Sequence, residues 1–470
     1  MHENSREVRH DNAAATAVLA PQKYGANPTL SAGDSTHYNK TLARKATFAG
    51  GVGTLIEYYE LSVYAFLALI IGPLFFPSAN PTVSTIATLG VFASSFLMRP
   101  IGGWFFGHVG DKYGRKVALL GSVGLMSMAC LLMGMLPTFA QIGVFATMAI
   151  ILLRLAQGFA AGGEIGGSAT YIAETAPPGK RGKYGSATAI GATLGFAVAS
   201  ATVGLTQLAL TDEQMVAFGW RIPFLLSVVL AAIALWGRMH IEESSDFKKL
   251  GEKSMEVEKS PIIAVIKAHP GQILRLVGLS IALNGTVYIG LTYFVIYLQM
   301  EGFNATGVSW VAAVSIAAAT LFYPFIGSLS DRFGRRAVLL GGYIGFALLA
   351  IPTFYVMSTT SSFLVVAVFY CAFMIFSGAS QVPTWALAAE LFPVKVRFTG
   401  IALGYNIGTI VAGGTAPLVA TYLVQTTGSS IAPAGWVILV SIIGIISVAT
   451  IKRRDNVPLP TTKEELVSVG

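Results

Sequence analysis

Five ionisable side chains interrupt long apolar stretches of this 470-residue chain: Glu57, Glu60, Arg99, Arg154 and Glu164. A charge at the centre of a lipid-spanning helix costs about 2.5–3.5 kcal/mol on insertion scales, so each needs a partner or water. Glu57 and Glu60 are three residues apart and therefore lie on one side of a helix. Their mutual repulsion favours protonation of one carboxylate, which would suit reversible proton binding. A structural carboxylate satisfied by a neighbouring helix is the alternative.

The two arginines cannot carry the proton, because arginine stays charged in proteins. Either can pair with a carboxylate, and Arg154 can also hold a carboxylate solute through two hydrogen bonds. Protonation of Glu164 or Glu57 would switch such an ion pair and change the relative stability of two conformations. We therefore predict that all five residues couple protons to a conformational change. Structural ion pairs are the alternative, as is an Arg99 side chain that reaches towards the membrane surface.

Polar and aromatic side chains in the apolar stretches are candidates for contact with a polar solute. Asn284 and Tyr288 are four residues apart, as are Gln381 and Trp385, so each pair lies on one helix face. Amide and hydroxyl groups can orient a solute, and aromatic faces attract cations. Interhelical hydrogen bonding is the alternative use of such residues. The predicted solute contacts are Arg154, Gln157, Tyr64, Asn284, Tyr288, Gln381, Trp385 and Asn406.

The elements that must position these residues follow from the composition. Apolar residues make up 54% of the chain and charged residues 11%, with a mean hydropathy of +0.66. A soluble protein carries about a quarter charged residues, and a disordered one has low hydrophobicity, so both classes are excluded. Cys130 and Cys371 offer neither a disulfide framework nor a metal site. We find no phosphate-binding loop and no nucleophile motif, so we expect no enzyme activity and no bound cofactor or metal.

Apolar runs predict twelve transmembrane helices, each long enough to cross about 30 Å of hydrocarbon. With the N-terminus in the cytoplasm, 27 of the 31 Lys and Arg residues fall in cytoplasmic segments. The positive-inside rule therefore places both termini in the cytoplasm. It also accounts for the net charge of +8 without a nucleic-acid partner. The predicted spans are 46–72, 83–107, 117–137, 141–170, 185–210, 219–238, 271–299, 306–327, 337–357, 363–390, 398–425 and 432–451.

A mixed-charge segment divides these spans into six plus six. We predict a disordered cytoplasmic tail over 1–45 without a cleaved signal peptide, and a first bundle over 46–238. A cytoplasmic central loop over 239–270 leads to a second bundle over 271–451, and residues 452–470 form a C-terminal cytoplasmic tail.

The two halves repeat the same short motifs at nearly the same offset. Gly107 to Lys116 and Gly327 to Arg336 share the pattern G-x3-D-x2-G-R-[KR] at an offset of 220 residues. A second pair of motifs joins a glutamate to an arginine seven residues later, at an offset of 216 residues. Such duplication of a six-helix unit is typical of transporters. The charged residues of the four motifs are Asp111, Arg115, Glu174, Arg181, Asp331, Arg335, Glu390 and Arg397.

The repeated loop pattern resembles the signature of the major facilitator superfamily. Within it, several motifs resemble the metabolite:proton symporter family, which includes α-ketoglutarate, proline/betaine, shikimate and citrate carriers. Those motifs are Ile56–Glu60, Phe96–Gly103, Arg154–Glu164 and Gly219–Phe224. The resemblance implies an all-α membrane protein with twelve transmembrane helices in two pseudo-symmetric six-helix bundles. It also implies that the charged residues of the repeated motifs form a gate, whose latch forms on the cytoplasmic side when the cavity faces outward. A plain turn flanked by solvated charges is the alternative.

The function expected from this resemblance is proton-coupled symport of a small polar metabolite by alternating access. Because Arg99 and Arg154 face an otherwise uncharged site, we favour an organic carboxylate such as α-ketoglutarate or another di- or tricarboxylate. A zwitterion such as proline or glycine betaine is the alternative, since Glu57 and Glu60 together would balance a cationic head. A transporter-derived solute receptor is an alternative of another class. We expect a monomer in the lipid bilayer of a bacterial inner membrane.

Overall fold

The computed structural model describes residues 40–113, 115–162, 179–239, 261–392 and 397–451, and every regular element in these ranges is helical. Most of the predicted tails and central loop lies outside these residues, as do Glu164, Glu174 and Gly114. However, residues 40–45 of the predicted disordered tail begin a helix, and residues 261–268 of the predicted central loop form another. The elements up to residue 239 are α1 (Lys40–Phe66), α2 (Ala68–Phe75), α3 (Pro81–Leu97), α4 (Arg99–Tyr113), α5 (Arg115–Met135), α6 (Phe139–Ile142), α7 (Val144–Gly162), α9 (Arg181–Ala209), α10 (Asp212–Gln214), η1 (Met215–Gly219) and α11 (Arg221–Met239).

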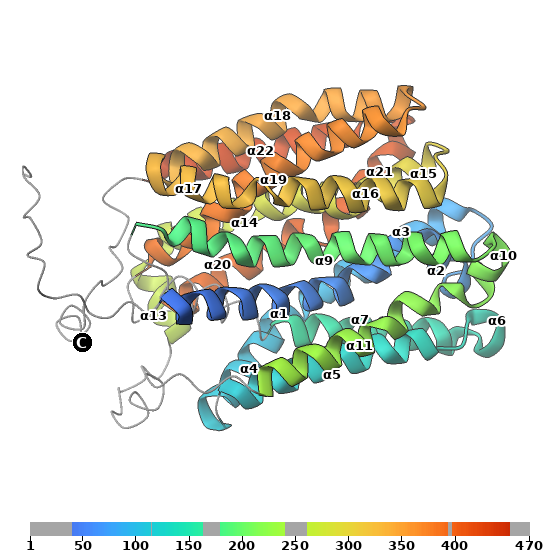
Figure 1. The fold of residues 1–470 in the computed structure, drawn as a ribbon, viewed down its shortest axis with the longest axis horizontal. Helices are drawn as coiled ribbons and strands as arrows, with labels where there is room; N and C mark the ends of the chain where they lie inside the picture. The colour runs from blue at the N-terminus through green and yellow to red at the C-terminus, as the bar shows by residue number, and fades with distance from the viewer. Residues whose placement is uncertain (1–39, 114, 163–178, 240–260, 393–396, 452–470) are drawn as a thin grey trace, which may run out of the picture. The chain divides into compact units, whose positions relative to one another are not determined.

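The elements after the central loop form a second series of helices (Figure 1). They are α13 (Pro261–Ala268), α14 (Pro270–Tyr288), η2 (Ile289–Tyr293), α15 (Phe294–Met300), α16 (Ala305–Thr320), α17 (Tyr323–Phe333), α18 (Arg335–Thr359), α19 (Phe363–Leu391), α20 (Arg397–Ala412), α21 (Thr415–Thr427) and α22 (Pro433–Thr450). We call α1–α11 the first half and α14–α22 the second half.

The helices account for the twelve predicted spans. Within the described ranges, nine helices are long and apolar enough to cross a bilayer. Two bent pairs, Gly50–Phe66 with Ala68–Phe75 and Asp212–Gly219 with Arg221–Ile233, supply two more, and the shorter apolar helix Leu120–Met135 coincides with the remaining one. The chain is therefore a multi-pass, all-α membrane protein with the predicted twelve-helix architecture.

Helix ends follow local sequence signals. The Asn80 side chain accepts a hydrogen bond from the backbone N–H of Thr82 at 2.9 Å, with Pro81 at the first helical position of α3. Asn304 caps α16 in the same way, accepting from the N–H of Gly307 at 3.1 Å. Between α17 and α18 the chain turns at Gly334, whose φ of +89° favours glycine. Gly334 is the second glycine of the repeated G-x3-D-x2-G-R-[KR] pattern.

Three spans depart from the simple helices that the sequence predicted, and the sixth of the twelve bends by 52° at Trp220. The first span bends by 61° between Phe66 and Ala68. Pro73 cannot donate to the carbonyl of Leu69, which weakens the backbone hydrogen bonding next to this bend. The seventh span contains the π-helical turn η2, and the Tyr370 hydroxyl donates to the Gly290 carbonyl within it at 2.6 Å.

Helix α9 joins the two halves. It packs against α1 of the first half and against α16 and α17 of the second half, and Figure 1 shows it (green) between α1 and α16. Helices α3 and α4 of the first half also contact α20 and α21 of the second half. At this second contact a Cβ on Gly414 would overlap Ala93 and the Phe96 ring, so the two backbones can approach only with glycine there. The candidate site lies between these two regions of contact.

Candidate functional site

A pocket lies where helices of both halves meet. Its space is about 460 Å³ when the part open to solvent is included. Helices α1 and α9 of the first half line it, together with α14, η2, α19 and α20 of the second half. The lining residues are Thr54, Tyr58, Thr188, Ala192, Leu283, Asn284, Val287, Tyr288, Leu291, Gln381, Trp385 and Tyr405. This set contains neither an acidic nor a basic side chain.

Four of the eight predicted solute contacts line this pocket: Asn284, Tyr288, Gln381 and Trp385. The Asn284 amide nitrogen donates to the Ser280 carbonyl at 2.8 Å and to the Thr409 hydroxyl at 3.1 Å. The Gln381 amide nitrogen donates to the Ser377 hydroxyl at 2.8 Å. Both amides are therefore fixed by helix residues behind the pocket.

Four aromatic rings form much of the pocket wall: Tyr58, Tyr288, Trp385 and Tyr405. The Trp385 and Tyr405 ring centroids are 4.7 Å apart, with the rings tilted by 41°. Their faces provide the negative potential that attracts a cation. The Thr188 hydroxyl oxygen is buried in the pocket wall and has no hydrogen-bond partner among the described atoms. The pocket thus offers aromatic faces and a hydroxyl instead of fixed charges.

Arg99 lies behind the tyrosines of this wall. It begins α4, is 2% exposed, and places its guanidinium carbon 4.2 Å from the centroid of the Phe96 ring. Tyr288 packs on the same Phe96 ring, and the charge of Arg99 acts on it. Tyr58, Tyr405 and Glu57 also interact with Arg99 electrostatically. The structure therefore brings together two of the predicted proton-coupling residues, Arg99 and Glu57.

Glu60 lies in a different environment from Glu57. It is 1% exposed and accepts a hydrogen bond from the Ser127 hydroxyl of α5 at 2.7 Å. Cys130 of the same helix lies 4.0 Å from the Glu60 carbonyl oxygen. The two glutamates of α1 are thus near different neighbours, Glu57 near the pocket tyrosines and Glu60 near α5.

Arg154 forms a second buried cluster with Gln157 and Tyr64, and none of these three residues lines the pocket. Arg154 is fully buried and donates from Nη1 to Gln157 Oε1 at 2.6 Å. Its guanidinium carbon lies 4.5 Å from the Tyr64 ring centroid and 5.1 Å from that of Phe92. Arg154 Nε and Nη2 and Gln157 Nε2 have no hydrogen-bond partner in the described part of the chain. The solute contacts predicted for this trio stay predictions.

Asn406, the remaining predicted contact, is 6% exposed and its Oδ1 has no described partner. It does not line the pocket, whereas its neighbour Tyr405 does. Tyr405 meets the same aromatic criterion in the sequence as Tyr288 and Trp385. For Thr54 and Thr188 we see no sequence signal, because single threonines in apolar helices are common and their position depends on how helices cross.

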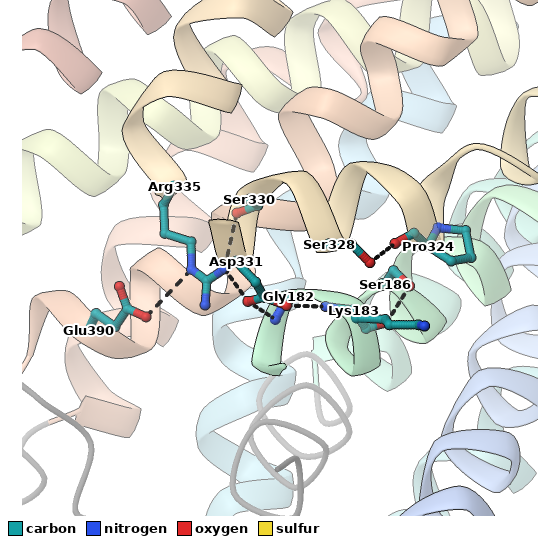
Figure 2. Close-up of polar contacts among 9 residues, drawn as sticks. All are labelled: Gly182, Lys183, Ser186, Pro324, Ser328, Ser330, Asp331, Arg335 and Glu390. Carbon is teal, nitrogen blue, oxygen red and sulfur yellow. Dashed lines mark hydrogen bonds and ion pairs between the residues drawn. The ribbon is translucent and has the colours of Figure 1, made fainter. Parts of the chain in front are cut away.

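Three charged residues of the second-half motifs, Asp331, Arg335 and Glu390, form a cluster around the start of α9 (Figure 2). Asp331 accepts hydrogen bonds from the backbone N–H groups of Gly182 at 2.8 Å and Lys183 at 2.9 Å. Arg335 Nη1 lies 2.6 Å from Asp331 Oδ1, and Arg335 Nε lies 3.6 Å from Glu390 Oε1. We call these five residues the Asp331 cluster. It joins α17, α18 and α19 of the second half to α9 of the first half.

The Asp331 cluster accepts hydrogen bonds from backbone N–H groups at the start of α9, which have no acceptor within the helix. Lys180, the residue before α9, supplies no side-chain cap. The carboxylate of Asp331 replaces that cap. Its negative charge also interacts favourably with the positive end of the α9 helix dipole. A Cβ on Gly182 would lie 2.6 Å from the Gly327 carbonyl oxygen, so α9 and α17 approach this closely only with glycine there. Burial raises the pKa of Glu390 above its ordinary value, and the positive charges of Arg335 and Arg181 oppose this rise.

The other predicted gate residues are less well defined. Arg181 is half-buried, and its charge acts on Glu390. The side chains of Asp111, Arg115 and Arg397 lie outside the described part of the chain, as does Glu174 entirely. The gate predicted for the first-half motifs therefore stays a prediction.

Comparison with known proteins gives the class of this chain. Residues 46–260 match the family model of sugar and other transporters, and residues 277–468 match that of the major facilitator superfamily. The structure superposes on the D-xylose-proton symporter with a TM-score of 0.69 at 18% identity, covering 88% of this chain and 98% of that one. An inward-open structure of the xylose transporter XylE from E. coli gives a TM-score of 0.67 at 17% identity, covering 91% and 99%. These two likenesses show the fold.

Sequence relatives narrow the family. The proline/betaine transporter of Salmonella typhimurium is 34% identical over 442 residues, covering 92% of this chain and 87% of the relative. The glycine betaine/proline/ectoine/pipecolic acid transporter of Dickeya dadantii is 33% identical, covering 88% and 84%. The proline/betaine transporter of Escherichia coli K12 is 34% identical, covering 88% and 85%. The chain therefore belongs to the major facilitator superfamily, as its motifs predicted, and the relatives named here are proline/betaine transporters.

Proposed function

We propose that this chain is a proton-coupled symporter of a small zwitterion of the proline or betaine kind, working by alternating access. The observation that carries the proposal is the pocket itself, which is aromatic and is lined without acidic or basic side chains. A zwitterion has no net charge to neutralise, and its cationic head fits aromatic faces. The proline/betaine transporters named above are the relatives that agree with this choice.

The carboxylate that the sequence analysis favoured fits the pocket less well. That preference assumed that Arg99 and Arg154 both face the solute, yet neither of them lines the pocket. A di- or tricarboxylate would bring two or three negative charges into a space without a fixed positive charge in its lining, which is costly. The zwitterion, the alternative in the sequence analysis, becomes the proposal.

Proton coupling is supported by two carboxylates of α1, one of which interacts with a buried arginine. Glu57 interacts electrostatically with Arg99 next to the pocket, and Glu60 is buried against α5. Protonation of either carboxylate changes the charge balance in the first half. Such a change alters the relative stability of two conformations, which is what coupling requires.

The Asp331 cluster supports a gate between the halves. Separation of α9 from α17 on one side of the membrane requires Asp331 to leave two backbone N–H groups, and the cost of that step helps to hold the gate closed. We place this gate on the cytoplasmic side, with both termini in the cytoplasm, as the distribution of Lys and Arg predicts. We further propose a monomer in a bacterial inner membrane, with residues 46–238 and 271–451 as its two bundles and no enzyme activity.

The test is a solute panel on purified protein in proteoliposomes, with an imposed inward proton gradient and an internal pH dye. Proline and glycine betaine should drive proton influx, whereas α-ketoglutarate, citrate and shikimate should not. Glu57→Gln should abolish the proton signal. Proton influx with a carboxylate alone would restore the first preference, and solute binding without flux would favour a receptor. Tracer flux without proton movement would remove the symport mechanism.

A further inference from the structure

We propose that Arg99 determines recognition of the solute's carboxylate without touching the solute, by polarising the hydroxyl groups of the pocket tyrosines. The inference rests on the proposed function, and it assigns to Arg99 a positioning role in solute specificity. Three of the twelve lining residues, Tyr58, Tyr288 and Tyr405, interact with this one guanidinium. They come from α1, α14 and α20, so a single guanidinium interacts with tyrosines of both halves.

The position of Arg99 is fixed by its surroundings. Its guanidinium stacks on Phe96, and the Phe96 ring meets the Tyr288 ring edge to face, with centroids 5.4 Å apart. Phe96 in turn packs at Gly414 of the second half. At 2% exposure the charge of Arg99 is shielded from water, so it acts strongly on nearby dipoles. Arg99 Nε has no hydrogen-bond partner among the described atoms, so the guanidinium has unused capacity to donate.

A tyrosine hydroxyl close to a buried cation becomes a stronger donor for its own proton. Tyr288 and Arg99 pack on the same Phe96 ring, and the charge of Arg99 acts on Tyr288. Its O–H proton can then be donated to a carboxylate in the pocket, while the ring faces of Trp385 and Tyr405 attract the cationic head. The two ends of a zwitterion would thus be recognised by different means, and a fixed positive charge would be absent from the pocket wall.

Recognition of the two ends of the solute can be tested separately with compounds that carry or lack the carboxylate. Glycine betaine and proline carry a carboxylate, whereas choline and pyrrolidine are their cationic counterparts without one. Equilibrium binding to the purified full-length chain is measured for all four compounds. Arg99→Gln should weaken betaine and proline binding about tenfold, the low end expected for hydrogen bonds that involve charge, and should change choline and pyrrolidine binding by less than about twofold.

A double-mutant cycle tests the route through tyrosine. If Arg99 acts through Tyr288, then Arg99→Gln combined with Tyr288→Phe should weaken betaine binding no more than Tyr288→Phe alone. Arg221→Gln is the matched control, because Arg221 also stacks on an aromatic ring, that of Trp220 at 4.2 Å, but lies away from the pocket. Should Arg99→Gln not yield folded protein, Arg99→Lys replaces it. Lysine keeps the positive charge but lacks the planar guanidinium that can interact with three tyrosines at once.

Each outcome is decisive. Equal weakening of betaine and choline would mean that Arg99 only supports the fold, and additive losses in the double variant would mean that it does not act through Tyr288. Unchanged betaine affinity in Arg99→Gln would also overturn the inference while leaving the proposed function intact. A wild-type protein that binds neither zwitterion would instead overturn the proposed function.

Discussion

The two halves of the molecule divide their polar chemistry unequally. The first half contains the buried charged residues Glu60, Arg99 and Arg154, with Glu57 partly buried beside them. The second half contributes eight of the twelve pocket-lining residues, and these are neutral polar, aromatic or aliphatic. Similar folds within one chain thus carry different chemistry, which suggests that protons are handled by the first half and that solute shape is read mainly by the second.

The largest effect is expected from a pair of alanine variants, one in each half. Arg154→Ala removes a fully buried guanidinium outside the pocket, so it should lower proton-coupled uptake more than about tenfold, as expected when a buried charged network is broken. Betaine binding should stay within about threefold of wild type. Asn284→Ala should instead weaken binding by about threefold to tenfold, the loss of a neutral hydrogen-bonding group, with an unchanged ratio of protons to solute.

These two variants are compared by equilibrium binding and by simultaneous solute and pH measurements in proteoliposomes. Identical defects in Arg154→Ala and Asn284→Ala would remove the division of labour between the halves.

The second prediction concerns the aromatic wall supplied by the second half. Trp385→Leu should weaken betaine binding about threefold to thirtyfold, because a desolvated cation loses its contact with an aromatic face. Trp385→Phe should retain most of the affinity. Trp436→Leu is the matched control in the same half: its indole donates to the Gly285 carbonyl at 3.0 Å, but it does not line the pocket. Equal losses at Trp385 and Trp436 would indicate a general packing defect.

The sequence predicted the parts of this site that depend on local spacing. Asn284 and Tyr288, and likewise Gln381 and Trp385, reach one pocket because residues four apart share a helix face. Thr54 and Thr188 were missed because their meeting depends on how α1 and α9 cross. Arg154 contacts Gln157 and the Tyr64 ring and does not line this pocket, so its expected contact with the solute stays a prediction. The bend at Leu67 was not predicted, although Pro73 nearby weakens the backbone hydrogen bonding there.

The third prediction moves from the pocket to the Asp331 cluster, which joins the halves. Asp331→Asn removes the charge that favours the start of α9, an effect of about 1 kcal/mol or roughly fivefold in the balance between closed and open states. A cysteine at Ser328, introduced after Cys130→Ala and Cys371→Ala, should then react severalfold faster with a maleimide. Arg332→Gln, an exposed residue of the same turn, should leave that rate unchanged. A rate unaffected by Asp331→Asn would show that the cluster does not hold the halves together.

The smallest effect is expected from the acid of the same cluster. Burial raises the pKa of Glu390, so the native state binds its proton more tightly than the unfolded state does. Its contribution to stability is therefore full below the ordinary glutamate value of 4.5 and is lost as the pH rises through the raised pKa. Since Arg335 and Arg181 oppose the shift, the change should stay below about 1 kcal/mol. The thermal unfolding midpoint, followed by intrinsic fluorescence between pH 4 and 8, should lose this component in Glu390→Gln and keep it in Glu213→Gln, whose acid is exposed on α10. A component with the opposite slope would mean that the ion pairs with the two arginines outweigh burial, and that the cluster is held by charge alone.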